Sequence, residues 1–193
     1  MGSDMRQVFA AFNAMAEKGI IESYAIGGAM AISLHEQPAM TEDIDIFIAH
    51  KRGKLISMSP LFEFMKSLGA KEEDGDHLRY AGWLIHILSP KSPSLVEEAL
   101  DDSESYDAGQ GVTTRVCLTA IALKAGRRYH QEVRTGKEIM TDLKPYGVDE
   151  AKDREWRRKQ AALSGAEKVD ILDRLNDGWH FLRSMKKIKE PAR

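Results

Sequence analysis

Two aspartates separated by a single residue, Asp43 and Asp45, are the side chains in this chain best suited to chemistry. On a β-strand, residues i and i+2 project from the same face, so this spacing places two carboxylates side by side, where a divalent cation can bridge them. A pair of oxygen ligands favours magnesium or manganese over zinc. The sequence therefore predicts a metal site at Asp43 and Asp45.

Two glycines, Gly27 and Gly28, precede the aspartates and open a segment rich in helix-forming residues. Glycine lets a backbone approach a phosphate closely, and the N-terminus of a helix offers unpaired N–H groups and the positive end of the helix dipole. These properties suit a triphosphate. Together with the aspartates, the glycines indicate a site for a nucleotide and its metal.

Residues 24–48, with the sequence YAIGGAMAISLHEQPAMTEDIDIFI, resemble the signature of the DNA polymerase β-like nucleotidyltransferase superfamily. The resemblance is closest to its small prokaryotic branch, which includes the abortive-infection type E toxins. The matching positions are Gly27, Gly28, His35, Thr41, Asp43 and Asp45. The resemblance implies a mixed sheet with flanking helices and magnesium-dependent transfer of a nucleoside monophosphate from NTP to an acceptor hydroxyl. It also implies that Gly27, Gly28 and Thr41 contact the substrate and that a cognate antitoxin is a candidate partner.

Two later positions are assigned through the same resemblance. The segment LTAIALKAGRR resembles the family helix whose lysine faces the nucleotide phosphates, which nominates Lys124. Family members usually carry a third carboxylate on a subsequent strand, and in GWLIHILSP that position is His86. Where the family commonly has an arginine, two residues before the threonine, this chain has Ala39.

His86 is accordingly a candidate catalytic residue beside Asp43 and Asp45. An imidazole can ligate manganese or iron, or accept a proton from an attacking hydroxyl, but it adds no negative charge to a magnesium site. A half-buried, hydrogen-bonded strand histidine fits the same pattern. His35, before a loop, is expected to be a packing or loop-fixing residue.

Three functions remain open from the sequence. The first is a metal-dependent nucleotidyltransferase that uses Mg²⁺ or Mn²⁺ and acts on RNA, a protein or a small molecule. The second is a degenerate member that keeps the fold and binds a nucleotide or a partner without catalysis, which Ala39 and His86 favour. The third is a plain interaction domain in which the aspartates are only a surface feature.

Composition excludes several other classes of protein. The 193 residues are 42% hydrophobic and 30% charged, with a net charge of −2, which is typical of a globular protein without a global attraction to nucleic acid or membranes. Cys117 is the only cysteine, so the chain forms no intramolecular disulfide and no multi-cysteine metal site. With neither a signal-peptide pattern nor a membrane-spanning run, we expect a cytoplasmic protein.

The elements that must position these residues follow from hydrophobic spacing. Helices are predicted over 5–18, after the two glycines, and over 60–68, 94–100, 118–129, 149–163 and 167–185. The last of these helices is expected to carry an apolar stripe of Val169, Leu172, Leu175, Trp179 and Leu182 along one side. Strands are predicted over 23–26 and 42–49, followed by a pair within HLRYAGWLIHIL hinged near Gly82. Strict alternation over 42–49 places Ile44, Ile46 and Ile48 on one face and Asp43, Asp45 and Phe47 on the other. The acidic stretch 101–111 is predicted to be a loop. The expected fold is α/β (or α+β), with a nucleotidyltransferase-like core over 1–111 and a helical C-terminal lobe over 112–193.

Overall fold

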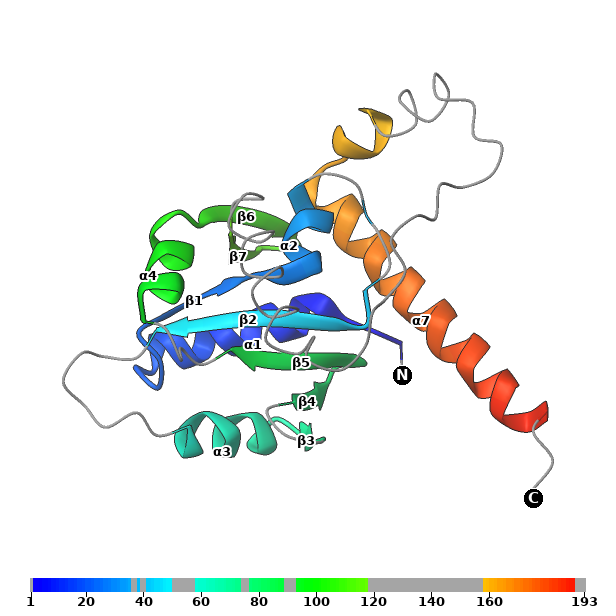
Figure 1. Cartoon of the computed structure of the whole chain (residues 1–193), viewed down its shortest axis with the longest axis horizontal. Coiled ribbons are helices and arrows are strands. Elements are labelled where there is room, and N and C mark those ends of the chain that lie inside the picture. Colours follow the sequence, from blue (N-terminus) through cyan, green and yellow to red (C-terminus); the bar gives the residue numbers. More distant parts are fainter. Residues whose placement is uncertain are drawn as a thin grey trace, which may run out of the picture.

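The computed structural model describes residues 2–35, 38, 41–49, 58–73, 77–88, 93–117 and 158–189. Its fold is α/β, with one mixed seven-stranded sheet in the order β3-β4-β5-β2-β1-β7-β6 (Figure 1). The strands are β1 (Ser23–Ile26), β2 (Asp43–Ala49), β3 (Lys71–Glu72), β4 (His77–Tyr80), β5 (Trp83–Leu88), β6 (Glu104–Gly109) and β7 (Val112–Val116). The helices with named bounds are α1 (Met5–Glu17), α2 (Gly28–His35), α3 (Ser59–Ser67), α4 (Pro93–Asp101) and α7 (Gly165–Lys189).

β2 lies in the middle of the sheet, and its two faces differ as the alternation predicted. Ile44, Ile46 and Ile48 are fully buried in the main core, which includes apolar residues of α1 and α3. The opposite face carries Asp43, Asp45 and Phe47, and only Phe47 of these three is buried, in a small cluster with residues of α4. The alternation therefore fixes the strand against the core and leaves the two carboxylates on the other face.

The hairpin that joins β4 to β5 turns at Ala81 and Gly82, both of which have a positive φ, at 49° and 80°. Two left-handed residues make the tight turn typical of a two-residue hairpin loop. The sequence predicted this turn from Gly82. Its register pairs Tyr80 with Trp83 and, further along, His77 with His86.

The prediction of a loop over 101–111 is wrong, because residues Glu104–Gly109 form the edge strand β6. β6 is largely exposed, so its polar composition reflects a solvent-facing edge strand rather than a connection. The following strand β7 pairs with both β6 and β1, so the sheet continues past residue 111, where the sequence placed a domain boundary. The structure does not describe the segments predicted to be helical over 118–129 and most of 149–163.

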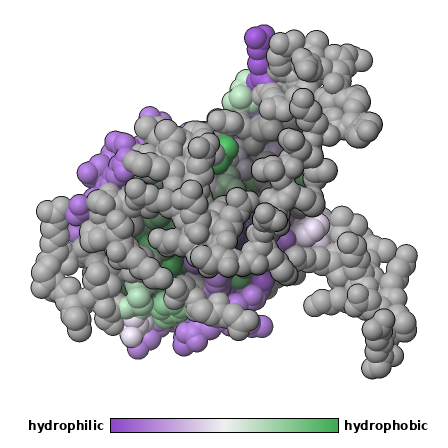
Figure 2. Space-filling view, in the orientation of Figure 1, coloured by the Kyte–Doolittle hydropathy of each residue, from purple (hydrophilic) through white to green (hydrophobic). Residues whose placement is uncertain are grey.

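The other edge of the sheet is formed by β3, which is only two residues long and exposes Lys71 and Glu72. A neighbouring ion pair joins Lys66 to Glu72 at 2.9 Å. Short, charged edge strands resist pairing with other chains. Figure 2 shows hydrophilic residues along the lower margin, where Figure 1 places α3, β3 and β4.

α7 packs against α1, α2 and β6, and it fastens the N-terminal segment to the sheet (Figure 1). The sequence predicted an apolar stripe that included Leu175, but Leu175 is 38% exposed. The buried residues of α7 are the apolar Val169 and Leu172 together with the polar Lys168, Asp173 and Asn176. The spacing of apolar residues predicted the helix, but its buried polar residues contact the N-terminal segment, more than 160 residues away in the chain.

Asp173 is the buried carboxylate of this contact. One of its oxygens, Oδ1, accepts hydrogen bonds from the backbone N–H of Met5 at 3.0 Å and from Trp83 Nε1 at 2.7 Å. Burial raises the pKa of Asp173 to about 6, and Asp4 acts in the same direction, while both hydrogen bonds and Arg6 oppose the shift. At neutral pH the ionised carboxylate therefore stays buried at a cost in stability.

We expect Asp173→Asn to stabilise the fold at pH 7.5, because an amide oxygen keeps both acceptor contacts and no charge is buried. The folded pKa lies above the unfolded value, so the native form binds more protons, and this group lowers stability as pH rises from about 4 to about 6. The gain should be on the order of 2 kcal/mol at pH 7.5 and small at pH 4.5. Urea unfolding at both pH values measures it.

The matched control is Asp177→Asn, since Asp177 also accepts a hydrogen bond, from the backbone N–H of Ser3, but is exposed. Because its carboxylate is exposed and no charge is buried there, Asp177→Asn should not give the gain in stability at pH 7.5 that is expected of Asp173→Asn. A pH-independent difference between Asp173→Asn and the native protein would contradict the assignment of the charge cost to Asp173.

Among the described helices, none combines the length and apolar character needed to cross a membrane. α7 is the longest of them, and its exposed charged side chains include Arg174 and Asp177.

Candidate functional site

The candidate site is built on three adjacent strands. Asp45 of β2 is the register partner of His86 on the parallel strand β5. His86 Nδ1 donates a hydrogen bond to Asp45 Oδ1 at 3.0 Å, since an ionised carboxylate only accepts. The side chain of His86 is 8% exposed and that of Asp45 is 25% exposed. His86 therefore lies directly beside the aspartate pair, at the position where the resemblance expected a third carboxylate.

The two glycines lie against β2, and each has a specific reason to lack a side chain. A Cβ on Gly28, whose φ is +56°, would overlap the carboxylate of Asp45. A Cβ on Gly27 would overlap the ring of Phe47. The backbone N–H of Gly27 also donates to the carbonyl of Asp45 at 2.8 Å. The start of α2 is thus held in contact with the aspartate strand.

Asp43 and Asp45 influence one another electrostatically. The pKa of Asp43 is raised, first by burial and then by the charge of Asp45, while His86, Thr41 and His77 lower it. Thr41 Oγ1 lies 3.4 Å from Asp43 Oδ1 and 3.3 Å from its backbone carbonyl, and it donates to both. A bound cation would relieve the repulsion between the carboxylates. Thr41 therefore lies beside Asp43, and its contact with a substrate stays a prediction.

His77 joins this site, and the sequence reading missed it. Its ring stacks on the ring of His86, with centroids 4.4 Å apart and planes inclined by 6°. Asp43, His77 and His86 each present one potential ligand atom, and these atoms all lie within 4.8 Å of one another. The three residues therefore form a candidate metal-binding triad. The two-residue turn at Gly82 was the available signal, because counting back from it places His77 opposite His86.

The remaining sequence candidates lie apart from the triad or outside the described residues. His35 Nε2 donates to the backbone carbonyl of Cys117 at 2.9 Å, which gives it the loop-fixing role expected. Burial raises the pKa of Cys117 to about 12, so its thiol stays protonated in the core. Lys124 and Ala39 lie outside the described residues.

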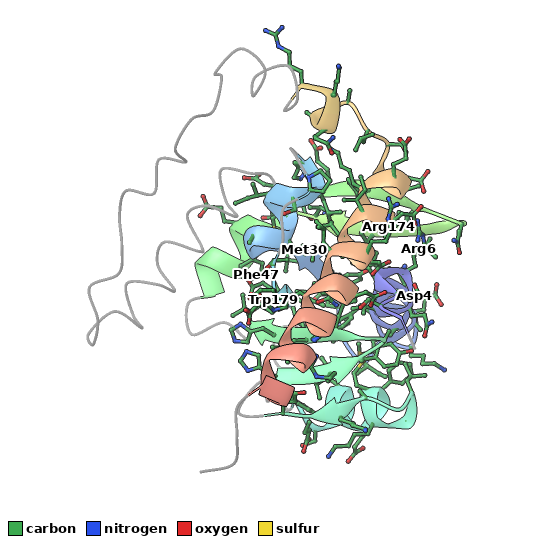
Figure 3. All side chains as sticks on the ribbon, turned by 90° about the vertical axis from the view of Figure 1, so that its right-hand side faces the viewer. Asp4, Arg6, Met30, Phe47, Arg174 and Trp179 are labelled. Atoms are coloured by element: carbon green, nitrogen blue, oxygen red, sulfur yellow. The ribbon has the colours of Figure 1, made fainter. Side chains whose placement is uncertain are left out.

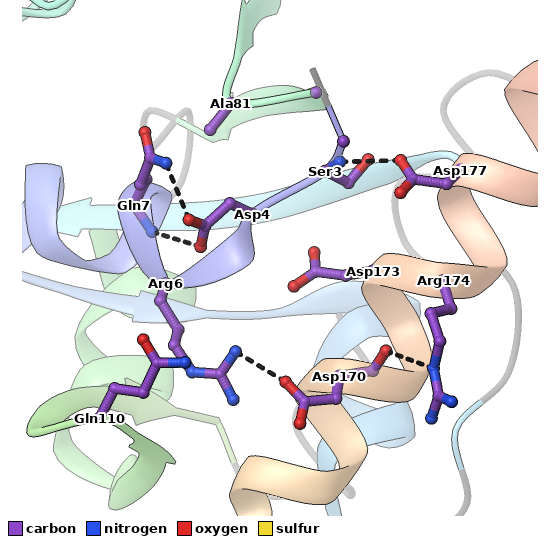
Figure 4. Close-up of a pocket in the computed structure, with 12 residues that line it drawn as sticks. Ser3, Asp4, Arg6, Gln7, Ala81, Gln110, Asp170, Asp173, Arg174 and Asp177 are labelled. Carbon is purple, nitrogen blue, oxygen red and sulfur yellow. Dashed lines mark hydrogen bonds and ion pairs between the residues drawn. The ribbon is translucent and has the colours of Figure 1, made fainter.

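A pocket with a volume of about 810 Å³ lies at the N-terminal end of α1 (Figure 4). Its polar groups hold the fold together: Arg6 pairs with Asp170 at 2.8 Å, and Asp4 accepts from the backbone N–H of Gln7. In the view onto α7, Asp4, Arg6 and Arg174 lie on one side of that helix, and Phe47, which shares the face of Asp45, lies on the other (Figure 3). The pocket is therefore separate from the candidate site.

Neither the known protein families nor the curated proteins contain a match to this chain. The functional proposal therefore rests on the geometry of the site formed by Gly28, Asp43, Asp45, His77 and His86.

Proposed function

We propose that this protein is a divalent-metal-dependent nucleotidyltransferase, which moves a nucleoside monophosphate from NTP to an acceptor hydroxyl. The observation that carries the proposal is the contact of Gly28, at the start of α2, with Asp45, which in turn accepts a hydrogen bond from His86. The elements arrange the glycine turn, the aspartate pair and the later strand around one point. The RNA, protein or small molecule that supplies the acceptor hydroxyl is chosen by other surfaces.

Asp43 and Asp45 are the residues that would hold Mg²⁺ or Mn²⁺, because their carboxylates share one face of β2. Such an ion supplies charge neutralisation for the phosphates and the leaving pyrophosphate. Its donor set fits this site, since the charge of Asp45 lies close enough to raise the pKa of Asp43. The neighbouring imidazoles favour Mn²⁺ over Mg²⁺.

The chain's own groups position the nucleotide. α2 begins at Gly28, and its first unpaired backbone N–H groups would be offered to the phosphates of a nucleotide. Thr41 adds a hydroxyl beside Asp43. Lys124, assigned to the phosphates by the family resemblance, keeps that role in the proposal.

His86 has two roles compatible with its hydrogen bond to Asp45. The bond places the proton on Nδ1 and the lone pair on Nε2. That lone pair can accept the proton of the acceptor hydroxyl, with Asp45 stabilising the imidazolium, or it can bind a metal. Either role makes His86 a working residue of the site.

The alternative is a nucleotide-binding or partner-binding protein that keeps this fold without catalysis. The observation that favours it is His86 itself, which leaves the Asp43–Asp45 pair without a third carboxylate at that position. In this alternative a cognate antitoxin remains a candidate partner, as the resemblance to abortive-infection toxins implies.

Transfer of label from α-³²P-NTP in Mg²⁺ or Mn²⁺, to RNA, to protein and to small hydroxyl compounds, tests the proposal. We expect His86→Asp to lower Mn²⁺-supported transfer at least about tenfold and to shift the preference toward Mg²⁺, because an oxygen donor replaces an imidazole. His180→Asp, at an exposed position on α7, is the matched control and should leave transfer unchanged.

The opposite sign is equally informative. Mg²⁺-supported transfer that appears or rises in His86→Asp would mean that His86 occupies a metal-ligand position that has lost its carboxylate. The native protein would then be a degenerate nucleotidyltransferase without catalysis. Absence of label transfer from the native protein with every NTP, metal and acceptor class would overturn the enzymatic proposal.

A further inference from the structure

Three side chains stand in one row across three neighbouring strands. Asp45 on β2 is opposite His86 on β5, and His86 is opposite His77 on β4. The parallel pairing of β2 with β5 and the antiparallel pairing of β5 with β4 both point these residues to the same face. Asp43 lies two residues along β2 on that face, which brings a carboxylate to the two imidazoles.

The donor atoms of Asp43, His77 and His86 are close enough to converge on one ion. They lie within 4.8 Å of one another, whereas donors about 2.0–2.2 Å from a common ion are roughly 3–3.5 Å apart. Small rotations of the side chains would close that difference, and the two rings, now inclined by 6°, would tilt toward the ion. Two nitrogens and one carboxylate oxygen form the ligand set of many transition-metal sites with open positions.

Asp45 orients one of these ligands, His86, through a hydrogen bond. A metal-ligating histidine almost always donates its second ring N–H to a carboxylate or carbonyl, which fixes the tautomer and the ring orientation. His86 does so, with Nδ1–H donated to Asp45 at 3.0 Å, and this places the lone pair on Nε2. Oδ2 of Asp45 faces Gly28, whose missing Cβ leaves the space. Asp45 is therefore a positioning residue for His86.

We propose that Asp43, His77 and His86 bind a first-row transition ion of the Zn²⁺ or Mn²⁺ class, with His86 serving as a ligand rather than as a proton acceptor. Asp43 would then serve as a ligand both for this ion and for the nucleotide's metal. The role of this ion in nucleotidyl transfer rests on the proposed function. Binding of the ion by itself does not require a nucleotide.

Titration calorimetry with ZnCl₂, MnCl₂ and MgCl₂, without nucleotide, tests the site on the full chain. We expect Zn²⁺ to bind with one-to-one stoichiometry and His77→Ala to weaken it at least about tenfold, because one of three protein ligands is lost. His180→Ala, an exposed histidine on the same chain, is the matched control and should bind Zn²⁺ like the native protein. Equal Zn²⁺ affinity in His77→Ala and the native protein would overturn the proposal.

Nitrogen-15 NMR gives a second measurement, made first on the native protein and then on one variant. In the metal-free protein, His86 should show the Nδ1–H tautomer, and Zn²⁺ should shift ring nitrogens of both His77 and His86. Asp45→Asn should weaken Zn²⁺ binding by about 10–100-fold, as expected for a residue that orients a metal ligand through a hydrogen bond. It should also change the population of the Nδ1–H tautomer of His86. Unchanged nitrogen signals on saturation with Zn²⁺ would contradict the site.

The two proposals fail separately. The metal-site proposal would stand and the enzymatic proposal would fail if Zn²⁺ or Mn²⁺ bound tightly through His77 but no label were transferred under any condition. Transfer supported by Mg²⁺ in His77→Ala at the native rate, with no transition ion bound by the native protein, keeps the enzyme and removes the metal site.

Discussion

Asp43→Asn combined with Asp45→Asn should abolish metal-dependent binding of NTP, with a loss of at least about a hundredfold in affinity, while the fold stays intact. Both carboxylates lie on the open face of β2, and removing them removes the oxygen donors for the nucleotide's metal. The asparagine at position 45 still offers a neutral oxygen to His86, which is a weaker acceptor than the carboxylate, so the fold of the site is kept while the His86 ring is held less firmly. The raised pKa of Asp43 indicates that stability will be unchanged or slightly higher.

Calorimetry with each NTP, with and without MgCl₂ or MnCl₂, measures this. Without metal, the double variant should bind NTP as well as or better than the native protein, because two charges that repel the phosphates are gone. Asp101→Asn with Asp102→Asn removes the same charge from exposed positions at the end of α4 and serves as the control. Unchanged metal-dependent affinity in the Asp43/Asp45 variant would remove the central hypothesis.

The sequence was most informative where a residue's surroundings are local. Strict alternation along β2 predicted three core isoleucines and an opposite face with two aspartates, and the burial of Ile44, Ile46 and Ile48 confirms it. Gly82 predicted the β4–β5 hairpin because a tight turn needs left-handed residues. Each of these features depends on neighbours within a few residues, which a pattern can record.

The rest of the site depends on pairings that the sequence does not record. The contact of Asp45 with His86 requires the register of two parallel strands separated by α3, β3 and β4, and that register is set by the whole core. The reason for Gly28 is the Asp45 carboxylate on a different strand, whereas the sequence reading assigned the glycine to phosphate approach. The edge strand β6 was read as a loop because an exposed strand carries a polar composition.

Gly28→Ala is the single substitution with the largest expected effect on the fold of the site. Its new Cβ would occupy the space of the Asp45 carboxylate, and alanine at a φ of +56° adds backbone strain. Strain at such a position costs roughly 1 kcal/mol, and displacing a packed side chain costs about 1–3 kcal/mol more. We expect a loss of about 2–4 kcal/mol in the free energy of unfolding and loss of the Asp45–His86 contact.

Gly111→Ala separates the two causes, because Gly111 has a φ of +76° and open space where its Cβ would lie. It should show the strain alone, about 1 kcal/mol. In an Asp45→Ala background the obstructing carboxylate is absent and only the Cβ of residue 45 remains, 3.1 Å from the new Cβ, so Gly28→Ala should cost much less than in the native protein and little more than Gly111→Ala. Urea unfolding of the four Gly28/Asp45 combinations gives the coupling energy directly. A coupling near zero would mean that Gly28 is a turn residue and that its contact with Asp45 does not shape the site.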